Sequence, residues 1–149
     1  MPSIREIAKK QTMDAAETMC RDASFILAEK LDWRPEEHGK SVNMILSECA
    51  KANMGIAAYI RGDEPSGEVE SADFASLKDC LVASAQQVCD AIDSLSDEAI
   101  EGDVKMPWGA IYPAGEAIFL PISHMTYHDG QINYIQVLLG DTKFHWAEE

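Results

Sequence analysis

Two histidines stand four residues apart in an otherwise apolar segment near the end of the chain. The segment reads PISHMTYHDGQINYIQVLLGD, residues 121–141, and the histidines are His124 and His128. On a helix this spacing projects both rings from one face, so that their nitrogens can share one metal at about 2.0–2.1 Å each. Spacing alone leaves two interpretations open: half of a divalent-metal site, or two core histidines that each hydrogen-bond to a neighbour.

A metal site of this kind needs a third protein ligand if it is also to keep an open position for catalysis. The stretch MILSECAKANMG offers Glu48, on the flank of an apolar stripe, and its neighbour Cys49. Glu48 is a credible ligand only if its helix faces the helix of the two histidines, and otherwise it is a solvated flank residue. Cys49 is the rival ligand, although a small buried core residue is the more ordinary role of such a cysteine.

Two familiar classes of metal enzyme are excluded by the residues around the histidines. In zinc metalloproteases a glutamate directly follows the first histidine and acts as general base, but here that position is Met125. Di-iron carboxylate bundles need a Glu-x-x-His pattern on each of two helices, and no glutamate stands three residues before His124.

Four segments with helical periodicity must position these side chains. Apolar residues recur at spacings of three and four over about 3–31, 41–61, 71–95 and 114–139. Four such helices predict an all-α fold, a four-helix bundle in which side chains on facing helices can build a metal site in the core. The long connection before the last helix, roughly 96–115, is unusual for a bundle.

Local signals predict where these helices begin, bend and end. Ser3 and Glu6 form a capping-box pattern at the first helix. Gly62 and Gly140 are placed to end the second and the fourth. Pro121 falls inside the fourth predicted segment, which predicts a kink one turn earlier. No segment alternates convincingly enough to predict a strand.

The remaining aromatic and histidine residues are expected to have structural roles or to border a pocket. Trp108 and Tyr112 lie in the connection before the last helix, where they could wall a pocket mouth or close the end of the bundle. His38 is expected in a loop, and His145 in an exposed tail. Gln131 lies one turn beyond His128, where it could orient a ligating ring or bond a neighbouring helix.

Composition narrows the function classes. The 149 residues fit one domain, 1–149, and 46% of them are apolar. The formal net charge is −14, from 26 acidic and 12 basic residues, which disfavours binding to nucleic acid and to anionic membranes. No apolar run is long enough to span a bilayer. The charged N-terminus is unlike a signal peptide, and the four cysteines lack a CxxC pair, so we expect a cytosolic protein.

Three stretches in order resemble the DinB-like (YfiT-like) metalloenzymes. HMTYHDGQ, from His124 to Gln131, is similar to that family's H-x-x-x-H-R-G-Q on the last helix. KLDWRP at 30–35 is similar to its motif between the first two helices, and ILSECAKAN at 45–53 to its I-L-x-H-x-x-x-A-N on the second. The MPWG tract before the last helix also recurs in relatives.

The resemblance implies a four-helix bundle with a long crossover, often dimeric, and a divalent metal held by three residues, usually histidines. His124 and His128 match two of them, and the third falls on Glu48. A ligand set of two histidines and one carboxylate suits zinc or iron, and also admits manganese or nickel. The departure at Glu48 could instead mean that the site is empty. Asp129 also replaces the arginine of the family pattern.

Characterised members of this family resemble thiol-dependent transferases and isomerases. The resemblance therefore implies a metal-dependent enzyme acting on a small-molecule substrate, with a low-molecular-weight thiol as partner and a homodimeric assembly. A divalent metal would stabilise the thiolate nucleophile. The alternative is a non-catalytic helical bundle that binds a partner or small molecule and carries a vestigial metal site.

Overall fold

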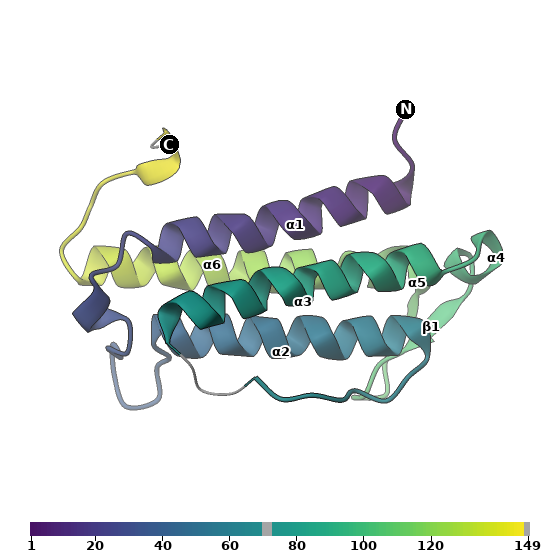
Figure 1. The fold of residues 1–149 in the computed structure, drawn as a ribbon, viewed down its shortest axis with the longest axis horizontal. Coiled ribbons are helices and arrows are strands. Elements are labelled where there is room, and N and C mark those ends of the chain that lie inside the picture. Colours follow the sequence, from purple (N-terminus) through teal and green to yellow (C-terminus); the bar gives the residue numbers. More distant parts are fainter. Residues whose placement is uncertain (70–72, 148–149) are drawn as a thin grey trace.

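The computed structural model describes residues 1–69 and 73–147, and four long helices dominate it (Figure 1). They are α1 (Ile4–Ala23), α2 (Val42–Arg61), α3 (Phe74–Ser94) and α6 (Leu120–Leu138). This confirms the predicted all-α four-helix bundle. The expected start of the third helix, at about residue 71, lies outside the described residues.

The packing of the four helices places α2 beside α6. Each of α1 and α2 packs against both α3 and α6, so the order around the bundle is α1, α3, α2, α6 (Figure 1). The chain crosses the bundle between α1 and α2 and again between α3 and α6. Glu48 was a credible ligand only if its helix faced the helix of the two histidines. The contact between α2 and α6 meets this condition.

The predicted helix caps are confirmed. The Ser3 side chain accepts from the backbone N–H of Glu6, and the Glu6 carboxylate accepts from the N–H of Ser3. Gly62 ends α2 with φ 78°, and Gly140 follows α6 with φ 97°. Both values lie in the left-handed region, where glycine alone avoids the Cβ penalty.

The first helix ends eight residues earlier than the periodicity predicts. α1 stops at Ala23, and a single 3-10 turn, η1 (Ala28–Lys30), follows in the connection. The Ser24 hydroxyl donates to the carbonyl oxygen of Arg21, a local bond that competes with continuing the helix. Leu27 is then extended, with ψ 139°, although the apolar spacing continues through it.

The predicted kink near Ala117 is wrong, because the last segment is two helices and not one. A single turn, α5 (Ala114–Ala117), is followed by α6, which begins at Leu120. Pro121 therefore lies in the first turn of α6. Its missing N–H costs nothing there, because no intrahelical partner would be available to that position.

The long connection between α3 and α6 contains a hairpin that the sequence did not predict. After the short helix α4 (Asp97–Ile100), strands β1 (Asp103–Lys105) and β2 (Ile111–Pro113) pair antiparallel, with Val104 opposite Tyr112. Three residues per strand are too few for a visible alternation. Val104 and Met106 of the hairpin are buried in one cluster with Ala114 and Ala117, which fixes the hairpin against the end of the bundle.

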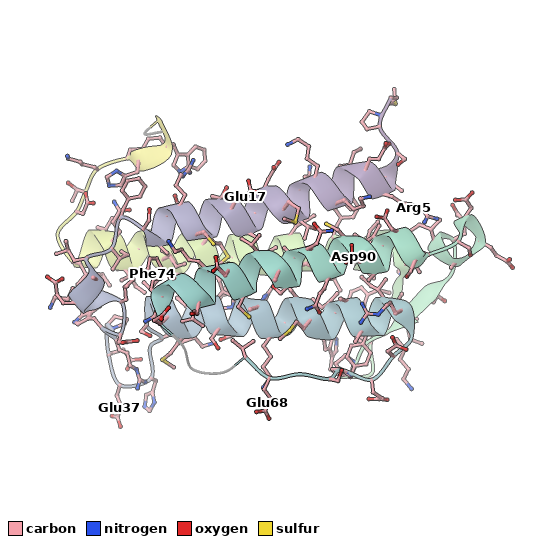
Figure 2. All side chains as sticks on the ribbon, in the orientation of Figure 1. Arg5, Glu17, Glu37, Glu68, Phe74 and Asp90 are labelled. Atoms are coloured by element: carbon pink, nitrogen blue, oxygen red, sulfur yellow. The ribbon has the colours of Figure 1, made fainter. Side chains whose placement is uncertain are left out.

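The core fills the space between the helices with aliphatic side chains and leaves an acidic exterior. The largest fully buried side chains include Met19, Leu46, Leu81, Ile92 and Ile132. On the outside, the labelled Glu37 and Glu68 point away from the bundle (Figure 2), and Glu17 on α1 is exposed. Among the described residues, no helix is both long and apolar enough to cross a membrane.

Candidate metal centre

The first three turns of α6 bring His124 and His128 together. Their ring centroids are 4.5 Å apart with an interplanar angle of 78°, as expected for residues at i and i+4 on one helical face. The His128 side chain is only 5% exposed, and that of His124 is 31% exposed. One ring is therefore anchored in the bundle while the other reaches its surface.

Glu48, on α2, points a carboxylate oxygen at both rings. Its Oε1 lies 3.2 Å from His128 Nε2 and 3.9 Å from His124 Nε2. Donor atoms bound to one tetrahedral metal at 2.0–2.1 Å stand roughly 3.3 Å apart. The three predicted ligands are thus brought together at separations close to those that a shared divalent metal requires.

Gln131 fixes the orientation of the buried ring. Its Oε1 lies 2.6 Å from His128 Nδ1, and an amide oxygen can only accept, so Nδ1 donates. In the neutral ring the Nε2 lone pair then faces Glu48 Oε1, which is also an acceptor. Two acceptors at 3.2 Å repel unless a proton or a metal cation lies between them.

Lys40 holds the other oxygen of the Glu48 carboxylate. Its ammonium forms a hydrogen-bonded ion pair with Oε2. Burial opposes ionisation of Glu48, but the bond from Lys40 and the nearby His128 outweigh it and lower the pKa of Glu48. The carboxylate is therefore ionised at neutral pH and leaves Oε1 directed at the histidines.

His124 is held in its neutral form. Burial, followed by the nearby His128, lowers the pKa of His124, outweighing the opposite effect of Glu48. Its Nδ1 is buried and makes no hydrogen bond to protein. A neutral imidazole has a lone pair to offer, which is the state that metal binding requires.

Cys49 is a fourth potential ligand in the same cluster. Its Sγ and one ring nitrogen each of His124 and His128 lie within 4.8 Å of one another. The cysteine is fully buried, and burial raises the pKa of its thiol to about 12. The structure thus keeps open the choice that the sequence posed between Cys49 and Glu48. Either set of three, with a carboxylate or with a thiolate, is chemistry that zinc accepts.

Sequence reasoning missed Lys40 as a partner of the site. It lies just before α2, eight residues from Glu48, and no periodic or motif signal links the two. For Gln131 the sequence allowed two roles, orienting a ligating ring or bonding a neighbouring helix. Its hydrogen bond with His128 supports the first. His38 is exposed in the first connection and makes no ion pair or ring contact with these residues.

The expectation that His145 is exposed is wrong. It lies in η2 (His145–Ala147), is 8% exposed, and stacks on Phe25 with ring centroids 3.9 Å apart. Its Nε2 also lies 2.8 Å from a carboxylate oxygen of Asp141. The stacked ring comes from the segment that follows α1, far from His145 in the sequence, so the local sequence of the tail could not predict this contact.

The comparisons with known proteins decide the family. A family model described as "DinB family" matches residues 8–146. The chain belongs to the DinB family. No curated protein matches the sequence, so this assignment rests on the family model and agrees with the resemblance carried by the last helix.

Several solved structures share the fold at low sequence identity. YfiT from Bacillus subtilis, described as a probable metal-dependent hydrolase with an unusual four-helix bundle topology, is 14% identical, with a TM-score of 0.76 over 91% of this chain and 87% of its own. A conserved protein from Enterococcus faecalis is 15% identical, with a TM-score of 0.76 over 94% and 99%. A mycothiol-dependent maleylpyruvate isomerase is 12% identical, with a TM-score of 0.69; the chain covers 63% of its length.

Proposed function

We propose that this DinB-family chain is a divalent-metal-dependent enzyme in which His124, His128 and Glu48 hold the metal. The observation that carries the proposal is the approach of two acceptors, His128 Nε2 and Glu48 Oε1, at 3.2 Å, with Gln131 holding the ring so that Nε2 faces the carboxylate. A divalent cation between them turns this repulsion into attraction. Zinc, nickel, iron and manganese all accept such a ligand set.

The reaction we propose is a thiol-dependent transfer or isomerisation on a small molecule. Bound metal would supply Lewis acidity that lowers the pKa of a thiol and stabilises its thiolate. In this chain Glu48 and Lys40 keep a fixed pair of charges beside the site, and Gln131 keeps His128 oriented. The relative described as a mycothiol-dependent isomerase supports a low-molecular-weight thiol as the partner, and YfiT supports metal dependence.

Assembly and location are the remaining parts of the proposal. On α6 the side chains of Val137 and Leu138 lie three and four residues after Tyr134, and Tyr134, Val137 and Leu138 are 64%, 48% and 45% exposed. An exposed apolar stripe of this kind suits contact with a second copy. Sedimentation of the wild type should give a dimer, and a monomer at all concentrations would exclude it. The four unpaired cysteines suit a reducing, cytosolic setting.

Metal analysis tests the proposed function. Protein purified without chelator should carry close to one equivalent of divalent metal, and His124→Ala should lose it. His38→Ala is the matched control, because His38 is exposed and makes none of the contacts of the site. Zinc at about 100 times its Kd should raise the Tm by roughly 5–10 °C in the wild type. A wild type that carries no metal and binds none added would refute the proposal.

The second candidate, a non-catalytic bundle with a vestigial site, is favoured by one contact. The Lys40 ammonium already satisfies Glu48 Oε2, which lowers the cost of leaving this carboxylate without a metal. Under this candidate, Lys40→Met should lower the Tm of the metal-free protein and zinc should leave the Tm unchanged. Under the metal-enzyme proposal, Lys40→Met frees Glu48 and zinc still raises the Tm.

A further inference from the structure

A cavity of about 510 Å³ opens beside His124, between α2, α6 and the β1–β2 hairpin. This volume lies within the roughly 300–1,000 Å³ range of small-molecule sites. The cavity is separate in its lining from the larger one of about 730 Å³ on the Glu48 side, which charged residues including Asp32, Lys51 and Asp73 border. The two sides of the candidate metal centre thus differ in polarity.

One face of α2 lines the cavity, and its two small residues, Ala52 and Gly55, leave room for it. Ala52, Gly55, Ile56 and Tyr59 line it, and their spacing of three, four and seven places them on one helical face. A Cβ added at Gly55 would meet no atom within 4 Å. The space above Gly55 is therefore open, and a larger side chain there can enter it without clashing with its walls.

Side chains of α6 form the wall of the cavity opposite α2. Leu120, Ser123, His124 and Tyr127 repeat the same spacing, and Trp108 of the hairpin borders the cavity at its rim. Trp108 is 61% exposed and Tyr127 is 68% exposed, so the rim is reached from solvent. His124 is the residue that belongs both to this lining and to the candidate metal centre.

The side chains that line the cavity favour an uncharged ligand. The lining contains no Asp, Glu, Lys or Arg side chain. Tyrosine, serine and tryptophan side chains supply neutral hydrogen-bonding groups. An anionic group held against this lining would find no side-chain cation to pair with, in a protein whose formal net charge is −14.

We propose that this cavity binds an uncharged, mainly apolar small molecule, and that its end at His124 presents the reacting group of that molecule to the metal centre. The part of the substrate that the cavity lining holds is thus neutral and mainly apolar, and a carboxylate or phosphate group there would have no charged side chain as a partner. The link to catalysis rests on the proposed function above, whereas the binding of a neutral apolar ligand beside His124 does not.

Two fluorescent probes that differ by one charged group test the inference. N-phenyl-1-naphthylamine is neutral, and 1-anilinonaphthalene-8-sulfonate adds a sulfonate to the same ring system. The neutral probe should bind the metal-free protein at least about tenfold more tightly than the sulfonate, a difference of about 1.4 kcal/mol. It should also shift the NMR resonances of the His124 ring and leave those of His38 unchanged. Equal affinity for the two probes, or an unshifted His124, would overturn the inference.

A second test fills the cavity with a larger side chain. Gly55→Leu should weaken binding of the neutral probe by about tenfold or more, since the new side chain occupies its place. Ala83→Leu, on the exposed face of α3, is the matched control and should bind the probe as the wild type does. Should Gly55→Leu fail to fold, Trp108→Ala removes a wall that is mostly exposed and should weaken binding about threefold or more. Undiminished binding in the folded variants would contradict the inference.

Zinc binding, measured beside probe binding, separates this inference from the metal-enzyme proposal, and the dependence on protein concentration tests whether a second copy covers the cavity. If zinc fails to bind the wild type while the neutral probe binds in a Gly55-dependent way, the metal-enzyme proposal falls and the ligand site stands. If zinc binds but the affinity for the neutral probe is the same in Gly55→Leu as in the wild type, the ligand site is refuted and the metal-enzyme proposal stands. Probe affinity that drops as protein concentration rises would mean that a second copy covers the cavity, which also overturns it.

Discussion

Glu48 is the residue at which two interactions meet. Its Oε2 is paired with the Lys40 ammonium, and its Oε1 faces the two histidines. In metal-free protein the ion pair with Lys40 keeps the carboxylate ionised and positioned. With metal bound, Lys40 would remain as a neighbouring positive charge, which opposes the cation but orients its ligand. The metal affinity of the site should therefore depend strongly on the residue at position 48.

The choice between Glu48 and Cys49 as third ligand can be read from cobalt-substituted protein. A thiolate bound to Co²⁺ gives a near-ultraviolet charge-transfer band, and a carboxylate does not. We expect no such band in the wild type, because Glu48 is already ionised and directs Oε1 at both histidines, whereas the Cys49 thiol would first have to lose its proton to the incoming metal. Glu48→Gln should weaken cobalt binding at least about tenfold, whereas Cys49→Ser should leave it unchanged. A strong band that disappears in Cys49→Ser would assign the ligand to the cysteine.

Gln131 should act on metal affinity without touching the metal. Replacing it with alanine removes the acceptor at 2.6 Å from His128 Nδ1, so the ring can turn and Nε2 loses its fixed direction. We expect zinc affinity to fall by about 10–100-fold, as measured by competition with a chromogenic chelator. Gln87→Ala, on the exposed face of α3, is the control. Equal affinities in the two variants would show that Gln131 has no orienting role.

At the scale of the elements, the contact between α1 and α6 carries an unusual acidic pair. Asn133 donates to carboxylate oxygens of both Asp22 and Asp129, and Asp22 is buried. Burial, together with the adjacent Asp22, raises the pKa of Asp129 to about 7. Where the related family pattern has arginine, this chain thus places a second carboxyl group against Asp22.

This pair predicts how stability changes with pH. The raised pKa means that folded protein keeps a proton on Asp129 between about pH 4 and 7 that the unfolded chain releases. The free energy of unfolding from this group is therefore greatest below pH 4 and falls as pH rises to about 7. Asp129→Asn should raise the Tm at pH 8 by roughly 3–6 °C, for about 1–2 kcal/mol, and by less at pH 5.

The comparison that checks this is thermal unfolding of the wild type and Asp129→Asn from pH 4 to 8, with chelator present. Asp79→Asn removes one exposed acidic charge from α3 and serves as the control for net charge alone. The same Tm increase at every pH, or an equal increase in the control, would mean that the contact with Asp22 does not set the proton affinity of Asp129.

Helix periodicity was enough to predict the bundle, because long amphipathic segments bury one face whatever their neighbours. It failed where local chemistry competes with that pattern. Ser24 ends α1 through a bond to Arg21, and Pro121 lies in the first turn of α6 and does not kink a longer helix. The strands of the hairpin are too short to leave a pattern. Glu48 could be proposed as a ligand from the sequence, but its pairing with Lys40 depends on how the first connection folds.

At the scale of the whole molecule, repulsion among the excess acidic side chains destabilises the folded state. The formal net charge of −14 makes the compact state repel itself, and long-range ion pairs offset only part of this. Arg5 contributes at one end of the bundle, where it donates to the carbonyl of Leu95 and pairs with Asp97 at 3.1 Å (Figure 2). This contact ties the start of α1 to the junction of α3 and α4.

Screening of this charge should stabilise the protein. Raising NaCl from 20 to 500 mM shortens the Debye length to a few ångströms, so repulsion among exposed carboxylates weakens. We expect the Tm of metal-free protein to rise by about 2–5 °C. Sucrose at equal osmolality controls for solute exclusion. A Tm that falls with salt would indicate that ion pairs such as Arg5–Asp97 outweigh the net repulsion.

The most direct measurement on the metal centre is anomalous diffraction from crystals grown with zinc. We expect one peak in the anomalous difference map at about 2.0–2.2 Å from Glu48 Oε1 and from one nitrogen each of His124 and His128, and no peak in crystals of His124→Ala. A map without a peak at this position, with the Lys40 ammonium still bound to Glu48, would contradict the metal centre and with it the proposed function.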